Sequence, residues 1–288
     1  MLLSISVRRM VCCMAVVLLA SSIGYSQIND TTVAAAETII GLRFTEQERD
    51  SFKSDLDEQL KAYQTIRNHK LDNEVPPAIT FNPIPVDYDR PSGQNRLQLR
   101  ESQYKGLPAN RSDLAFYSVR DLAHLIRTRQ MTSLELTRFF IDRLRRYDQQ
   151  LHCVITITEE RALREARQAD AEITAGQYRG PLHGIPYGAK DLLAVKGYKT
   201  TWGAEPYKNQ VIDEDAAVIK KLHDAGAVLV AKLTLGALAW GDVWYGGMTR
   251  NPWNLQQGSS GSSAGSAAAT AAGLVPFAIG SETWGSIV

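Results

Sequence analysis

The chain has 288 residues, of which 44% are hydrophobic and 22% charged, and its formal net charge is +1. This is the composition of an ordinary globular protein, long enough to enclose a large hydrophobic core. The balanced charge excludes the basic surface that binds nucleic acid or anionic lipid. We therefore expect a small, largely neutral ligand and no nucleic-acid partner.

The first 26 residues are typical of an export signal. Arg8 and Arg9 give a positive start, an apolar run covers 10–20, and small residues precede a plausible cleavage point before Gln27. The alternative is a membrane anchor, but the apolar run is shorter than the roughly 20 residues that span a bilayer. The sequence predicts a periplasmic or extracellular protein with no membrane anchor after cleavage, exported by the general or the twin-arginine route.

The cysteines and histidines of the sequence do not have the spacing of a metal site. Cys12 and Cys13 lie in the predicted leader, so Cys153 alone would remain and could form no intrachain disulfide. No two of the five histidines stand three or four residues apart, and no phosphate-binding Walker loop is present. We expect no metal and no cofactor.

Two segments precede the main domain. Residues 27–72 predict a helical extension, in which Thr45 and Glu48 form a capping box at the start of one amphipathic helix. The apolar stripe of this helix consists of Phe52, Leu56, Leu60 and Tyr63. Prolines at 76, 77, 83, 85 and 91 break any regular pattern, so residues 73–111 predict an irregular connector.

Residues 112–288 alternate between helical and strand patterns, which predicts an α/β fold with a sheet covered by helices. In chain order we expect helices with apolar faces at 122–126 and 134–144, a strand at 153–157, a helix at 162–169, a strand at 184–189 leading into Lys190, a helix at 216–223 and a strand at 227–231.

A stretch rich in glycine, serine and alanine covers 258–272. It is either a flexible linker or a closely packed segment, and the buried-strand pattern at 274–279 directly after it favours packing. Ser263 also lies in the G-x-S-x-G pattern of an α/β-hydrolase elbow. That elbow needs a preceding strand and a later histidine, whereas 254–260 is a poor strand and every histidine precedes Ser263.

Three motifs in order along the chain resemble the amidase signature family. Residues 180–191 (GPLHGIPYGAKD) are similar to its lysine motif, and 249–254 (TRNPWN) to the segment before its serine-rich loop. Residues 261–287, from GSSAGSAAA to SETWGSI, resemble the signature itself. The similarity spans about 118–288 and implies a mixed β-sheet with helices on both faces.

The resemblance implies a Ser-Ser-Lys triad that cleaves amides through an acyl-enzyme intermediate. Ser286 would be the nucleophile, Ser262 the bridging serine beside a cis peptide bond, and Lys190 the base. An amide is a poor electrophile with a poor leaving group, so the hydroxyl must lose a proton and the departing nitrogen must gain one. A lysine without such support is usually a solvated strand end, and Lys190 acts as a base only if burial keeps it neutral.

The resemblance also implies an oxyanion hole made by backbone N–H groups of the turn Thr283, Trp284, Gly285 and Ser286. The turn departs from the family pattern, since Trp284 stands where glycine is common, Glu282 where aspartate is common and Val288 where arginine is common. Tryptophan fits the turn without strain only if its φ is negative.

The family domain is longer than 112–288, so we expect an incomplete domain, a C-terminally truncated fold, and a fragment that is inactive alone. Three functions stay open for the parent protein: a hydrolase of small amides, an amidotransferase-like subunit, and a binding protein with a disabled site. Neither substrate nor oligomeric state follows from the sequence.

Five tryptophans either line an aromatic pocket or pack in the core: Trp202, Trp240, Trp244, Trp253 and Trp284.

Overall fold

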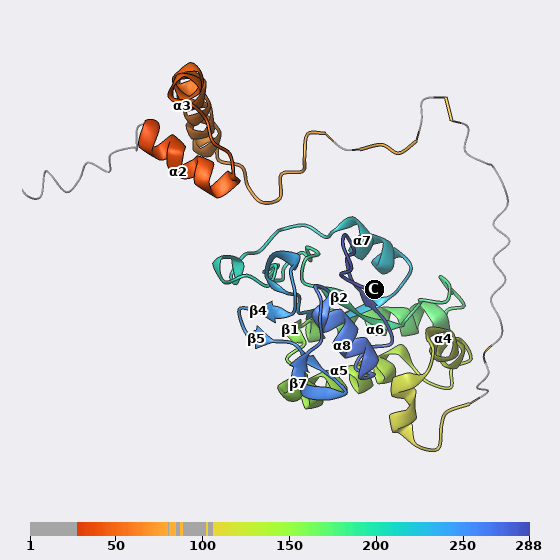
Figure 1. The fold of residues 1–288 in the computed structure, drawn as a ribbon. Helices are drawn as coiled ribbons and strands as arrows, with labels where there is room; N and C mark the ends of the chain where they lie inside the picture. Colours follow the sequence, from red (N-terminus) through yellow and green to blue (C-terminus); the bar gives the residue numbers. More distant parts are fainter. Residues whose placement is uncertain (1–27, 80, 85–86, 89–101, 103–105) are drawn as a thin grey trace, which may run out of the picture. The chain divides into compact units, whose positions relative to one another are not determined.

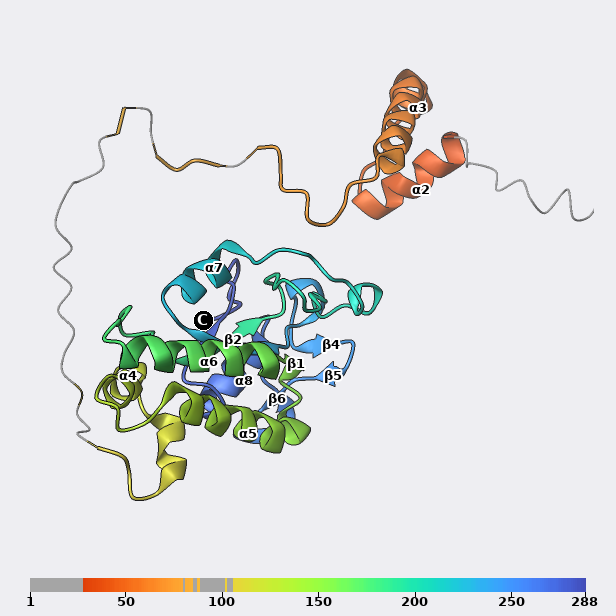
Figure 2. The ribbon, with the colours of Figure 1, turned by 180° about the vertical axis from the view of Figure 1, so that it is seen from behind.

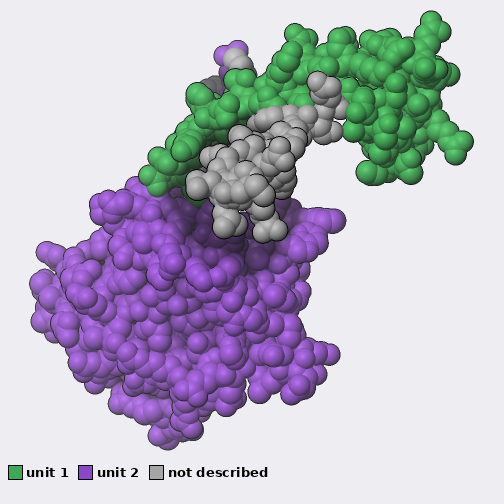
Figure 3. Space-filling view, turned by 90° about the vertical axis from the view of Figure 1, so that its left-hand side faces the viewer, with its two compact units in different colours: residues 1–86 green, residues 87–288 purple. Residues whose placement is uncertain are grey.

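The computed structural model describes residues 28–79, 81–84, 87–88, 102 and 106–288. The predicted leader lies outside these residues. The chain divides into two compact units, residues 1–86 and residues 87–288, and this boundary falls inside the predicted connector (Figure 3). In the described part of the chain, no helix has both the length and the apolar composition needed to cross a membrane.

The N-terminal unit contains two helices, α2 (Asp30–Ile40) and α3 (Glu46–Asn68). The predicted capping box of α3 is confirmed: the Thr45 hydroxyl accepts from the N–H of Glu48 at 3.3 Å, and the Thr45 N–H donates to the Glu48 carboxylate at 2.7 Å. The sequence analysis missed α2, which begins with a capping box of its own at Asn29.

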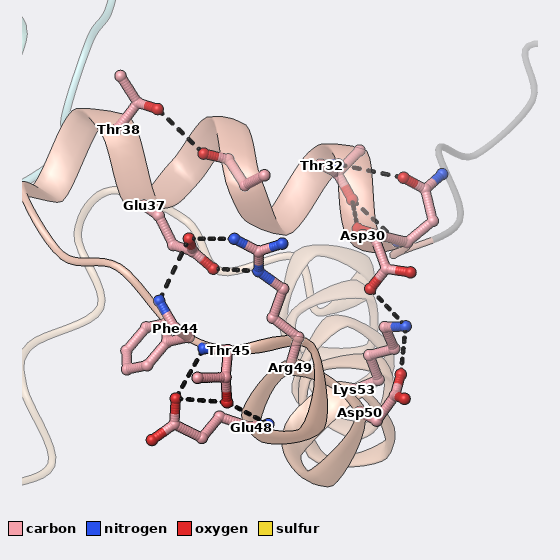
Figure 4. Close-up of polar contacts among 12 residues, drawn as sticks. Asp30, Thr32, Glu37, Thr38, Phe44, Thr45, Glu48, Arg49, Asp50 and Lys53 are labelled. Atoms are coloured by element: carbon pink, nitrogen blue, oxygen red, sulfur yellow. Dashed lines mark hydrogen bonds and ion pairs between the residues drawn. The ribbon is translucent and has the colours of Figure 1, made fainter.

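Charged side chains join the two helices (Figure 4). Arg49 of α3 binds the Glu37 carboxylate with two hydrogen bonds of 2.6 Å. Lys53 lies between Asp30 of α2, at 2.6 Å, and Asp50 of its own helix, at 2.7 Å. The apolar core of this unit is small.

The second unit is built on a four-stranded mixed sheet, which confirms the predicted α/β class. The strands are β1 (Val154–Ile157), β2 (Pro186–Lys190), β3 (Val228–Leu233) and β8 (Ala278–Ile279), in the order β1-β3-β2-β8. β1 is antiparallel to β3, while β2 is parallel to both β3 and β8. β2 and β3 are buried along their whole length, as central parallel strands usually are.

Helices cover both faces of this sheet (Figures 1 and 2). On one face, α5 (Ser133–Leu151), α6 (Glu159–Thr174) and α8 (Ala264–Ala271) share a core with β3. On the other, α7 (Ala217–Asp224) packs on β2 through Ile219 and Leu222. The remaining helices are α4 (Val119–Arg127) and the short η1 (Arg111–Phe116), η2 (Glu205–Tyr207) and η3 (Ala237–Ala239).

The glycine-rich stretch is packed and is not a flexible linker. Its second half forms α8, most of whose residues are buried. Gly265 on this helix lies so close to the end of β3 that a Cβ there would come within 2.4 Å of the Thr234 nitrogen. Small residues therefore serve close backbone approach here, as the sequence indicated.

Two strand predictions were wrong in part. Residues 254–260 were expected to be a poor strand, yet Asn254–Gly258 forms β7, which pairs with β6 (Arg250–Asn251). A local hairpin needs little apolar pattern because only one neighbour pairs with it. Conversely, of 274–279 only Ala278–Ile279 is a strand, although Leu274 and Val275 are buried. A second hairpin joins β4 (Val243–Trp244) to β5 (Gly247–Met248).

Candidate active site

Lys190 is the last residue of β2, and its side chain is fully buried. Its Nζ lies within hydrogen-bonding distance of three hydroxyls: Ser262 at 2.9 Å, Ser263 at 3.1 Å and Ser281 at 2.8 Å. Burial lowers the pKa of Lys190 to about 8, although the negative charge of Glu282 acts in the opposite direction. The expected burial of this lysine is therefore present, and it favours the neutral form that a base requires.

Ser262 joins Lys190 to the predicted nucleophile. Its Oγ lies 2.9 Å from Lys190 Nζ and 3.1 Å from Ser286 Oγ. The peptide bond between Gly261 and Ser262 is cis, as the family resemblance implied. A Cβ on Gly261 would lie 2.0 Å from the Gly241 carbonyl oxygen, so only glycine fits at this position. The three predicted side chains thus form one continuous hydrogen-bonded chain.

Two further serines belong to the site, and the sequence analysis missed both. The Ser263 hydroxyl donates to the Ser281 carbonyl at 3.1 Å and accepts from the Ser281 N–H at 3.2 Å. The sheet explains the position of Ser281, because Ser281 lies two residues after β8, and β8 runs parallel to β2, which ends at Lys190. The carboxyl ends of parallel neighbours meet at one edge of a sheet.

The turn before Ser286 is organised around the Glu282 carboxylate. This group accepts from the N–H of Ser286 at 2.8 Å, of Ile287 at 2.5 Å and of Val288 at 3.3 Å. Desolvation raises the pKa of Glu282, but these backbone donors and that of Gly285 outweigh it and lower the pKa overall. Two of the four predicted oxyanion donors, Gly285 and Ser286, are therefore directed to Glu282 in this conformation.

The tryptophan in the turn is compatible with the backbone. The left-handed conformation, φ 82°, falls on Gly285 and not on Trp284. The side chain of Trp284 is 82% exposed. The expected condition for an unstrained tryptophan is met, and the family glycine is not required at this position.

A buried ion pair lies immediately beside the site. The Asp191 carboxylate contacts Lys232 Nζ at 2.5 Å, and both side chains are fully buried. Asp191 also accepts from the Thr201 N–H at 2.7 Å, and Lys232 donates to the Lys199 carbonyl at 2.9 Å. The pair therefore ties the ends of β2 and β3 to the loop around residue 200.

Metal binding has no support in the described ranges, where no group of three or more histidine, cysteine, aspartate or glutamate side chains is placed to hold an ion. Cys153 is fully buried, and burial raises the pKa of its thiol. A buried thiol of this kind is unreactive.

The sheet, the buried lysine and the serine-rich turn define an α/β protein of the amidase-signature class. A family model described as Amidase matches residues 135–288, and the chain belongs to this family.

Curated and solved relatives cover the same part of the chain. The A subunit of glutamyl-tRNA(Gln) amidotransferase from Acinetobacter baumannii is 42% identical over 179 residues, which is 61% of this chain and 36% of that protein. A peptide amidase solved with the competitive inhibitor chymostatin is 37% identical with a TM-score of 0.56, covering 59% of this chain and 37% of the amidase. An amidase family protein from Bacillus anthracis is 30% identical with a TM-score of 0.58, covering 62% and 37%. The chain spans about a third of the length of these relatives.

Proposed function

We propose that the protein is a serine hydrolase of amide bonds in which Ser286 attacks, Ser262 relays the proton and Lys190 accepts it. One observation carries this proposal: the unbroken path from Lys190 Nζ through Ser262 Oγ, at 2.9 Å, to Ser286 Oγ, at a further 3.1 Å. Hydroxyls both donate and accept, so such a path moves a proton without moving a heavy atom.

In the proposed reaction, Ser286 Oγ bonds to the amide carbon as its proton passes to Ser262 and the Ser262 proton passes to Lys190. The carbonyl π electrons move to the oxygen. When the tetrahedral species collapses, the carbon–nitrogen bond breaks and the proton returns along the same path to the leaving nitrogen. Water then attacks the acyl ester, and its proton passes to Ser262 as the Ser262 proton passes to Lys190. When the bond between the acyl carbon and Ser286 Oγ breaks, the proton returns through Ser262 to Ser286 Oγ and the carboxylic acid is released.

Ser263 and Ser281 fit a positioning role in this scheme. A neutral amine has two N–H bonds and one lone pair, and Lys190 has three hydroxyl neighbours. If the two N–H bonds point to Ser263 and Ser281, the lone pair is left facing Ser262. The two additional serines would thus orient the base toward the relay.

The oxyanion would bind to backbone N–H groups of the turn. Because the N–H groups of Gly285 and Ser286 are directed to Glu282, those of Thr283 and Trp284 are the remaining candidates among the four. Loss of one such donor typically costs about 3 kcal/mol of transition-state stabilisation.

The proposal is tested by replacing Ser286 with alanine in the natural full-length protein and measuring hydrolysis of simple aryl amides. We expect a loss of about 10⁴-fold or more in kcat. Ser266→Ala is the control, because Ser266 is a buried serine of the same segment that donates to the Ile279 carbonyl at 3.1 Å, outside the proposed path. Equal activity in the wild type and the Ser286 variant would refute the assignment.

The second candidate is an amidotransferase-like subunit, which the similarity to the A subunit of glutamyl-tRNA(Gln) amidotransferase favours. The proposed export signal argues against it, since aminoacyl-tRNA is a cytosolic substrate, and a net charge of +1 provides no basic stripe for tRNA. Fractionation of cells separates the two: recovery of the protein in the cytosol, with its leader intact, would favour the amidotransferase. A third candidate, a binding protein with a disabled site, predicts that Ser286 does not react with a fluorophosphonate.

A further inference from the structure

Two tryptophan rings lie together on the surface beside the proposed nucleophile. Trp240 and Trp284 have ring centroids 5.9 Å apart at an interplanar angle of 36°. Their side chains are 72% and 82% exposed. Tryptophan is the largest apolar side chain, and two of them paired in solvent form an uncommon surface feature that usually marks a binding site.

The backbone links the segments that carry both rings to Ser262 and Ser286. Trp284 stands two residues before Ser286, in the turn that the Glu282 carboxylate holds by hydrogen bonds. Trp240 follows η3, whose leading Gly236 donates its N–H to the Ser262 carbonyl at 3.3 Å. A ligand that touches the rings is therefore held near Ser262 and Ser286.

The segment that carries Trp240 is in an unusual conformation. Leu238 and Ala239 both have positive φ, 53° and 64°, although neither is glycine. Hydrogen bonds support them, since Leu238 donates its N–H to the Trp202 carbonyl and Ala239 donates to the Gly236 carbonyl, each at 2.9 Å. Non-glycine residues persist in this region only where the surroundings enforce it, and such residues concentrate at functional sites.

We propose that Trp240 and Trp284 form an aromatic shelf that binds an aromatic ring of the substrate next to the scissile amide. This inference rests on the proposed function, and it specifies the substrate class as amides that carry an aromatic ring close to the carbonyl group. An aromatic ligand can pack against the two rings in offset-stacked or edge-to-face contacts, and this packing removes apolar surface from water. Nothing in the pair offers a charge to a polar substrate.

The test compares two substrates in the natural full-length protein, phenylacetamide and propionamide. We expect Trp240→Ala to lower kcat/KM for phenylacetamide by about tenfold, mainly through KM, with less than about a twofold change for propionamide. Trp284→Ala should also lower the ratio of kcat/KM for phenylacetamide to that for propionamide, and Trp284→Phe should keep most of the preference. Trp253→Ala is the control, since Trp253 is 81% exposed on the β6–β7 hairpin.

The possible outcomes distinguish binding of the aromatic ring by the shelf from hydrolysis of the amide. If Trp240→Ala slows both substrates equally, or lowers the melting temperature without changing their ratio, another part of the protein covers the rings and the inference is wrong. If the wild type hydrolyses neither amide, the proposed function fails, and the shelf is then judged by binding. Phenylacetamide should still bind to the Ser286→Ala protein about tenfold more tightly than to the Ser286→Ala, Trp284→Ala double variant, as measured by ligand-observed NMR. Equal binding would reject the shelf.

Discussion

The two units of the chain use ion pairs that are buried to different degrees. In the N-terminal unit, Arg49 and Glu37 join two helices, and water reaches the pair through Arg49, whose side chain is 23% exposed against 6% for Glu37. In the second unit, Asp191 and Lys232 are fully buried, and Lys190, next to Asp191 in sequence, is buried among three hydroxyls. Burial changes what a charge does: a pair that water still reaches adds little to stability, whereas a charge in the core determines protonation and stability.

The largest expected effect on activity comes from removal of the buried base, Lys190. Lys190→Met keeps an unbranched side chain one atom shorter but has no group that accepts a proton, so amide hydrolysis should fall by about 10²–10⁴-fold. Lys196→Met serves as the control, because Lys196 pairs with Asp213 at the surface. Activity is measured as kcat/KM, and a Lys190→Met protein with wild-type kcat/KM would show that Lys190 is not the base.

The buried ion pair should show the next effect. Lys232→Met leaves the Asp191 carboxylate buried and unpaired, and the free energy of unfolding should fall by about 3–5 kcal/mol. The double variant Asp191→Asn, Lys232→Met removes both charges and should recover a large part of that loss. Urea unfolding measures both values. If the double variant is as unstable as the single one, the cost lies in lost packing and not in the unpaired charge.

The partly buried pair of the N-terminal unit should show the smallest effect. Arg49→Ala removes both hydrogen bonds to Glu37, and we expect lower helicity of the α2–α3 unit by circular dichroism with no change in amide hydrolysis. Arg43→Ala, on the linker between the two helices, is the comparison variant. A large loss of activity on replacing Arg49 would mean that the N-terminal unit takes part in the reaction.

The order of helices and strands was predictable because each has a local signal. The capping box at Thr45 and the apolar face of α4 follow from side-chain spacing alone. Helix α2 was missed although its capping box at Asn29 is a local signal. The strand β7 was unexpected because a strand that pairs only with its hairpin neighbour β6 needs little apolar pattern of its own.

In the candidate site, the motifs identified Lys190, Ser262 and Ser286, but not the number of hydroxyls around the lysine. Ser281 comes close to Lys190 only because β8 is parallel to β2, and this pairing is a property of the sheet. Likewise, the motif identified the turn as a source of N–H donors. The hydrogen bond from the Ser286 N–H to the Glu282 carboxylate depends on the conformation of the Glu282 side chain, which the motif does not determine. The export signal, the truncation and the catalytic roles stay predictions.

The central claim is that a neutral, buried Lys190 activates Ser286 through Ser262. The most direct test is the rate at which a fluorophosphonate labels Ser286 as a function of pH, in the natural full-length protein and in Lys190→Met. Because burial lowers the pKa of Lys190 to about 8, the fraction of neutral lysine rises as the pH passes through that value, and labelling should accelerate between about pH 7 and pH 9. The step should vanish in Lys190→Met. An identical pH dependence in both proteins would contradict the claim.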